Sequence, residues 1–138
     1  MKFTYPYKVK YYETDKMGIV HHSNYVRWLE DARIEFLRSI GIEFKDFEAL
    51  GILSPVVSVE CKYKNVCEFS DDIEISCEIS QYNGAKLTLS YEVFNKTSQK
   101  LSLLAKSEHA FIYNGRICAL KNVNKEFDDI LKEKCKKS

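Results

Sequence analysis

Apolar positions in the first third of the chain follow the period of an α-helix. Between Asn24 and Ile40 they recur at gaps of four, three, four and four residues, at Tyr25, Leu29, Ala32, Phe36 and Ile40. This spacing places them on one face of a helix, because an α-helix has about 3.6 residues per turn. Ser23 is a natural N-cap, and Gly41 stands where a left-handed C-cap residue belongs. The pattern predicts an amphipathic helix over 24–40 and a second, short helix over 43–50.

Most of the remaining chain alternates between apolar and polar residues, as half-buried strands do. Residues 3–12 are rich in β-branched and aromatic side chains and predict a first strand, in which Pro6 favours an edge position. Further strands are predicted over 57–64, 73–80, 87–93, 101–113 and 116–120. Asn83-Gly84 and Asn114-Gly115 predict hairpin turns, because both residue types tolerate positive φ.

These elements predict an α+β fold, with one strand, one long helix and then antiparallel strands in hairpin order. We expect a curved sheet of about five strands wrapped around the helix at 24–40, because each strand has only one apolar face. One helix cannot cover so wide a sheet and its edges, so we expect homodimerisation through the sheet or an edge strand. The 138 residues suit one domain over 1–138, and its tail, 121–138, begins as a helix and ends frayed.

Composition and charge exclude several classes of protein. Hydrophobic residues make up 45% and charged residues 30%, which indicates an ordinary globular domain. The 21 Lys and Arg nearly balance the 20 Asp and Glu, which argues against a nucleic-acid binder. No apolar run approaches the roughly 20 residues of a membrane span, and the polar start is unlike a secretory signal. Five cysteines without a CxxC pair favour free thiols in a reducing cytoplasm and predict no metal site.

The segment most suited to chemistry is 11–25, between the first strand and the long helix. Glu13, Asp15, His21 and His22 stand there, immediately before a helix N-terminus. Backbone N–H groups at such an end lack partners within the helix, and the helix dipole favours negative charge there. Gly18 allows a sharp turn that brings a carboxylate to the same place. A carboxylate beside oxyanion donors is suited to carbonyl chemistry.

Residues 12–25 read YETDKMGIVHHSNY, and the string continues as VRWLEDAR to Arg33. This string resembles the signature of the 4-hydroxybenzoyl-CoA thioesterase family, including its Tol-Pal-associated acyl-CoA thioesterase branch. The resemblance implies the hotdog fold, in which a helix is wrapped in an antiparallel sheet, and dimers that often pair into tetramers. It also implies hydrolysis of an acyl-CoA substrate to a free acid and CoA, with no cofactor because CoA is part of the substrate.

The resemblance also implies roles for individual residues. Asp15 matches the catalytic aspartate, which acts either as a nucleophile or as a general base on water. The backbone N–H of His22 matches the oxyanion donor, and its side chain lines the acyl pocket or orients Asp15. Asn24 orders the loop and Tyr25 packs beneath it. The residues assigned to substrate binding are Gly18, Val20, Asn24 and Tyr25.

Other interpretations compete with this one. Glu13 is interpreted as a solvated loop acid, and His109 as a histidine whose hydrogen bonds are satisfied within the sheet. A hotdog dehydratase is disfavoured, because the histidine-phenylalanine-proline type signature is absent. Some hotdog thioesterases take their carboxylate from the central helix, where this chain has Glu30, Asp31 and Glu35. A module that binds acyl-CoA or an acyl-carrier protein without turnover is the alternative outside enzymes.

Overall fold

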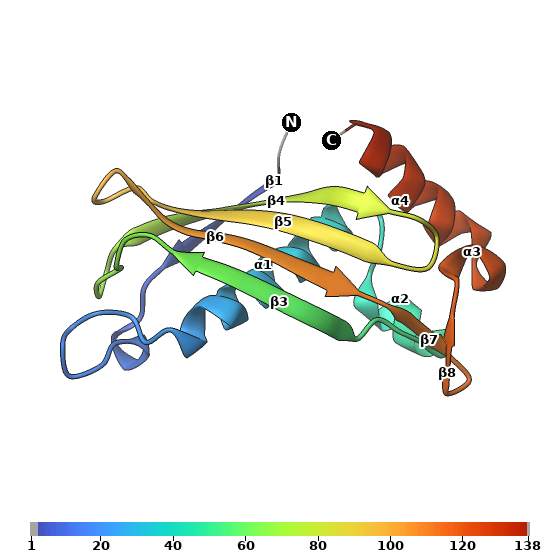
Figure 1. Cartoon of the computed structure of the whole chain (residues 1–138), viewed down its shortest axis with the longest axis horizontal. Helices are drawn as coiled ribbons and strands as arrows, with labels where there is room; N and C mark the ends of the chain where they lie inside the picture. The colour runs from blue at the N-terminus through green and yellow to red at the C-terminus, as the bar shows by residue number, and fades with distance from the viewer. Residues whose placement is uncertain (1–2, 138) are drawn as a thin grey trace.

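Figure 1 shows a long helix lying against an elongated antiparallel sheet in the computed structural model, which describes residues 3–137. Met1, Lys2 and Ser138, which belong to the predicted domain and tail, lie outside the described residues. The large sheet contains β1 (Phe3–Lys8), β3 (Val56–Tyr63), β4 (Asp72–Tyr82), β5 (Leu87–Asn95) and β6 (Lys100–His109). A smaller sheet contains β2 (Ile52–Leu53), β7 (Phe111–Tyr113) and β8 (Arg116–Cys118). The helices are η1 (Tyr11–Glu13, a 3-10 helix), α1 (Ser23–Ser39), α2 (Phe44–Ala49), α3 (Leu120–Val123) and α4 (Lys125–Lys137).

The predicted long helix is confirmed as α1, and its apolar face is buried against the large sheet. The fully or nearly fully buried apolar side chains of α1 are Tyr25, Trp28, Leu29, Ala32, Phe36 and Leu37. Gly41 ends the helix as predicted, with φ of 97°. The N–H of Gly41 bonds the carbonyl of Arg38, and that of Ile42 bonds the carbonyl of Leu37, which together form a Schellman motif.

The predicted N-cap is wrong by one residue. His22 occupies the N-cap position and Ser23 is the first helical residue. The Ser23 hydroxyl contacts Nδ1 of His21 at 2.9 Å, so it bonds a neighbouring ring instead of capping the helix. The ring of His21 therefore takes part in the start of α1.

The predicted hairpin order of the strands is wrong at β3. The order of the large sheet is β1-β4-β5-β6-β3, so β4 pairs with β1 and β5, and β3 pairs with β6. The alternation of apolar and polar residues indicates which face of a strand is buried, but it does not indicate which strand pairs with it. The first strand is also shorter than predicted, because the chain turns into η1 after Lys8. The run 101–113 divides at Ala110 into β6 and β7, which belong to different sheets.

The C-terminal tail packs on the sheet. Its predicted fraying is wrong, because α4 continues as a helix to Lys137. Phe127 and Leu131 of α4 are buried, and the Tyr82 hydroxyl at the end of β4 donates a hydrogen bond to the Asp128 carboxylate. Figure 1 shows α4 beside the end of β4, away from the loop before α1. α1 is therefore not the only helix that covers the sheet.

Strand β3 forms one edge of the large sheet and is exposed on both faces. Its side chains at Val56, Val57, Val59 and Tyr63 are between 41% and 56% exposed. Within residues 3–137, β6 is the only strand that pairs with β3. One side of an apolar edge strand is therefore left without a partner in the single chain.

Candidate active site

Asp15 lies in a tight turn that its own backbone and side chain close. The Gly18 N–H donates to the Asp15 carbonyl at 2.9 Å, and the Asp15 N–H donates to the Ile19 carbonyl at 2.9 Å. The Met17 N–H donates to Oδ1 of Asp15 at 2.8 Å. Gly18 has φ of 80°, a left-handed conformation that side chains with a Cβ disfavour. The carboxylate of Asp15 is exposed in the single chain and is held in a defined position at the tip of the loop.

Backbone bonds hold this loop against the start of α1. The Glu13 carbonyl accepts hydrogen bonds from the His21 N–H at 2.9 Å and from Nδ2 of Asn24 at 2.9 Å. Thr14 and Val20 form an antiparallel bridge across the loop. Asp15 follows Thr14 directly, so the turn that carries the carboxylate belongs to a loop whose base, at Glu13, is bonded to the start of α1.

The interpretation of Glu13 as a solvated acid is wrong. Its side chain is only 4% exposed and accepts three hydrogen bonds. The donors are the Tyr7 hydroxyl at 2.8 Å, Nε1 of Trp28 at 2.7 Å and the Lys10 N–H at 2.8 Å. Burial and the neighbouring carboxylate raise the pKa of Tyr7, so its hydroxyl remains a donor. Glu13 thus ties β1, the loop that carries Asp15 and α1 together.

The backbone N–H of His22 is available at the helix N-terminus. The N–H groups on either side are used: that of His21 bonds the Glu13 carbonyl, and that of Ser23 faces Nδ1 of His21 at 3.3 Å. The His22 N–H has no acceptor anywhere in residues 3–137. It points from the end of a 17-residue helix, where the helix dipole adds positive potential. The position therefore suits a developing negative charge on a ligand oxygen.

The other residues assigned to substrate binding lie beneath the loop. Val20, Asn24 and Tyr25 are each less than 9% exposed. The Tyr25 ring packs edge-on against Trp28 at 4.9 Å and Tyr63 at 5.4 Å between ring centroids. These side chains support the loop from inside the molecule.

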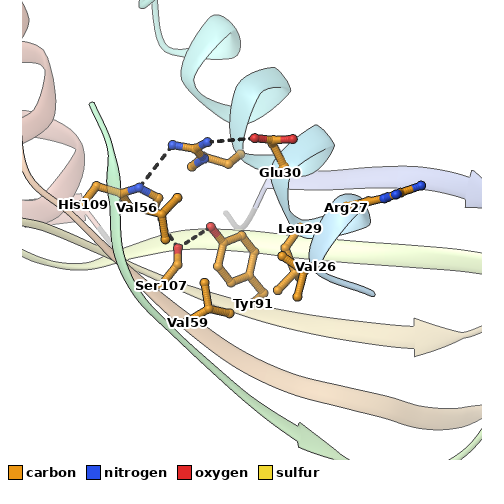
Figure 2. Close-up of a pocket in the computed structure, with 10 residues that line it drawn as sticks. Val26, Arg27, Leu29, Glu30, Val56, Val59, Tyr91, Ser107 and His109 are labelled. Carbon is orange, nitrogen blue, oxygen red and sulfur yellow. Dashed lines mark hydrogen bonds and ion pairs between the residues drawn. The ribbon is translucent and has the colours of Figure 1, made fainter. Parts of the chain in front are cut away.

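A separate cavity of about 110 Å³ lies between α1 and strands β3, β5 and β6, as Figure 2 shows. Its apolar wall includes Val26, Leu29, Val56 and Val59. None of the six residues that we assign to catalysis or substrate binding lines it. The loop with Asp15 and the cavity are thus two separate features of the single chain.

Four buried polar side chains form a connected network at one end of this cavity. Nη1 of Arg33 lies 3.1 Å from Nδ1 of His109, and Nε2 of His109 lies 2.7 Å from the Ser107 hydroxyl. The Ser107 hydroxyl lies 2.7 Å from that of Tyr91. Burial and the charge of Arg33 lower the pKa of His109 to about 4. The interpretation of His109 as a satisfied sheet histidine is confirmed, but the sequence did not predict its partners, because Arg33 is 76 residues away.

Across residues 3–137, no three His, Cys, Asp or Glu side chains converge as a metal ion would require. No helix in that range combines the length and the apolar character needed to cross a bilayer.

Residues 9–132 match the thioesterase-like superfamily. A putative esterase from Aquifex aeolicus is 35% identical over 133 residues, which cover 96% of this chain and 100% of the relative. The putative acyl-CoA thioesterase YneP of Bacillus subtilis is 37% identical over 102 residues, covering 74% and 73% of the two chains. The crystal structure of a DHNA-CoA thioesterase from Staphylococcus aureus superposes with a TM-score of 0.91 at 25% identity, covering 96% and 89%.

The match spans most of the chain, and the protein belongs to the thioesterase-like superfamily. The predicted α+β hotdog fold is confirmed by this membership and by the solved structures that share it. The protein is therefore an enzyme of the thioester hydrolase class.

Proposed function

We propose that this protein hydrolyses acyl-CoA thioesters to a carboxylic acid and CoA. One observation carries the proposal: the Asp15 carboxylate is fixed in a turn of the loop that is bonded to the start of α1, where the His22 N–H has no acceptor within residues 3–137. In the reaction, the oxygen of water bonds to the acyl carbon, the carbon–sulfur bond breaks, and the CoA sulfur leaves with a proton. The similarity to YneP, a putative acyl-CoA thioesterase, supports the same chemistry.

The proposed roles rest on the family resemblance of the loop, and its geometry supports them. The His22 N–H binds the carbonyl oxygen of the thioester and stabilises the negative charge that develops on it. Asp15 either attacks the acyl carbon or removes a proton from the attacking water. Gly18 and Val20 shape the loop around the thioester, and Asn24 and Tyr25 hold that loop on α1.

The placement within the superfamily is also a proposal. The sequence from Tyr12 to Arg33 supports membership of this protein in the 4-hydroxybenzoyl-CoA thioesterase family and in its Tol-Pal-associated branch. We propose that the enzyme uses no cofactor, because a carboxylate and backbone donors suffice for thioester hydrolysis. All five cysteines are free thiols, which suits a reducing cytoplasm.

A panel of acyl-CoA substrates tests the activity directly. The protein is mixed with short aliphatic, long aliphatic and aromatic acyl-CoA, and the loss of thioester ultraviolet absorbance is followed. We expect hydrolysis of at least one class with a kcat/KM of about 10⁴ M⁻¹s⁻¹ or more. A thiol-reactive dye would be confounded by the five cysteines. Binding without turnover across the panel would contradict the proposal and support a noncatalytic binding module.

We also propose that the protein is a homodimer paired through β3, and that two dimers associate into a tetramer. The free edge of β3 carries exposed valines, and edge strands of this kind pair readily with another chain. The cavity beside α1 is walled in part by Val56 and Val59 of this strand. A second copy on β3 would therefore also cover that cavity.

The variant Val57→Glu tests this interface, because Val57 is 56% exposed on β3. We expect the wild type to sediment at two or four times 16.1 kDa and the variant to shift towards 16.1 kDa. A charge placed against the same charge of the partner disfavours pairing. Ile117→Glu is the matched control, because Ile117 is 80% exposed on β8 and lies off this edge. A monomeric wild type, or equal masses for Val57→Glu and the wild type, would contradict the β3 dimer.

A further inference from the structure

The polar end of the cavity beside α1 has a fixed direction of hydrogen bonding that begins at Arg33. A guanidinium group has only donors, so Nη1 of Arg33 donates to Nδ1 of His109. The His109 ring is neutral at physiological pH, because burial and the Arg33 charge lower its pKa to about 4. The single ring proton therefore resides on Nε2, which donates to the hydroxyl oxygen of Ser107.

This direction leaves one hydroxyl proton without an acceptor. Ser107 and Tyr91 carry two hydroxyl protons between them, and the 2.7 Å bond that joins them uses one. Neither hydroxyl contacts a further acceptor in the described part of the chain. Both residues line the cavity and are nearly fully buried, so the remaining proton has only the cavity to point into. A buried donor without an acceptor costs free energy, which a ligand or water oxygen in the cavity relieves.

The second polar group at this end is also a donor. Arg33 is 5% exposed, and its only carboxylate partner among residues 3–137 is Glu30, at 3.7 Å, with 62% of the Glu30 side chain exposed. The charge of Arg33 is thus weakly compensated on the cavity side. Both groups favour an acceptor oxygen and disfavour a cation, while the opposite wall of valines and leucine favours apolar groups.

The cavity lies on the helix face that begins at the proposed oxyanion donor. His22, Val26, Leu29 and Arg33 are spaced by four, three and four residues, which keeps them within one narrow stripe of α1. The axial distance from His22 to Leu29 is about 10 Å, from the rise per residue of a helix. A thioester held at the His22 N–H can therefore extend its acyl group along this stripe into the cavity.

We propose that the cavity is the acyl subsite and that it selects acyl groups with an acceptor oxygen at the distal end over hydrocarbon acyl groups of the same shape. The hydroxyl pair of Ser107 and Tyr91, with Arg33 behind it, recognises that oxygen. This inference rests on the proposed acyl-CoA thioesterase activity. It adds the chemical class of the acyl group.

Two pairs of substrates of matched shape test the selection. One pair is 5-oxohexanoyl-CoA and 5-methylhexanoyl-CoA, and the other is 3-hydroxybenzoyl-CoA and 3-methylbenzoyl-CoA. For the pair that the wild type uses better, we expect kcat/KM to favour the oxygen-bearing member by about tenfold or more. The double variant Tyr91→Phe/Ser107→Ala removes both hydroxyls, and we expect it to bring this ratio to within about twofold of one. A general loss of activity lowers kcat/KM for both members of a pair, so it does not change their ratio within one variant.

The matched control is Tyr82→Phe/Ser80→Ala, which removes a tyrosine and a serine hydroxyl from β4, outside the cavity lining. Its ratio should equal that of the wild type. A wild type without preference, or a double variant that keeps the preference, would overturn the proposal. Calorimetric Kd values of the same pairs with Asp15→Asn separate this failure from failure of the thioesterase proposal. Absence of turnover with a tenfold Kd preference overturns the activity alone, whereas equal Kd values overturn the selection.

Discussion

Replacing Asp15 with asparagine should reduce kcat/KM for the best acyl-CoA substrate by about 10²–10⁴-fold. The amide has the size of the carboxylate, and its oxygen still accepts the Met17 N–H, so the turn is preserved. Only the negative charge and the basicity are lost, and both the nucleophilic and the general-base mechanism require them. Thioester absorbance measures the rate, and circular dichroism checks that the fold is unchanged.

The matched control for this variant is Asp46→Asn, because Asp46 is exposed in the first turn of α2 and lies outside the loop. Its activity should stay within about twofold of the wild type. If Asp15→Asn keeps full activity, the carboxylate is elsewhere, and Glu30, Asp31 and Glu35 on α1 become the candidates. Label found in Asp15 after a single turnover in ¹⁸O-labelled water would show the nucleophilic mechanism, because water can label Asp15 only by attacking its carbonyl carbon in an anhydride with the acyl group.

Replacing Glu13 with glutamine should lower the free energy of unfolding by about 2–4 kcal/mol, because Glu13 is a buried carboxylate with three donors. The amide nitrogen of glutamine is itself a donor and must face the Tyr7 hydroxyl, the Trp28 indole or the Lys10 N–H. Urea unfolding measures the change, and thermal unfolding should show a midpoint lower by about 10 °C.

Glu48→Gln is the control for charge alone. Glu48 is exposed on α2, and its side chain forms no hydrogen bond or ion pair within residues 3–137. We expect a change of less than about 0.5 kcal/mol in its unfolding free energy. Equal changes for Glu13→Gln and Glu48→Gln would show that the buried carboxylate does not hold the loop.

The elements that the sequence predicted well are those whose signal is local. The apolar stripe from Tyr25 to Phe36 requires only the period of a helix, and Gly41 requires only a left-handed C-cap. The Asn83-Gly84 turn was also readable, because the Asn83 side chain bonds the N–H groups of the two residues after the glycine. The sequence could not predict the pairing of β3 with β6. Two strands, β4 and β5, lie between them along the chain, and the alternation of apolar and polar residues carries no information about pairing partners.

The candidate site divides in the same way. The loop from Tyr12 to Tyr25 was found because its residues are consecutive and resemble a family signature. Glu13 was misjudged because its burial depends on Tyr7 and Trp28, which lie on other elements. The network of Arg33, His109 and Tyr91 gave no signal, because only the fold brings α1, β5 and β6 together around one cavity.

Trp28 is the only tryptophan of the chain, and its indole N–H is bonded to Glu13 at the junction of the loop and α1. The residue is 1% exposed, and its ring centroid lies 5.2 Å from that of Tyr7, in a tilted arrangement, and 4.9 Å from that of Tyr25, edge-on. Intrinsic fluorescence excited at wavelengths beyond the tyrosine absorption band therefore comes from one residue, whose indole is bonded to Glu13, two residues before Asp15 in the sequence. The protein carries its own optical reporter of loop position, and no label needs to be introduced to follow the loop during binding and turnover.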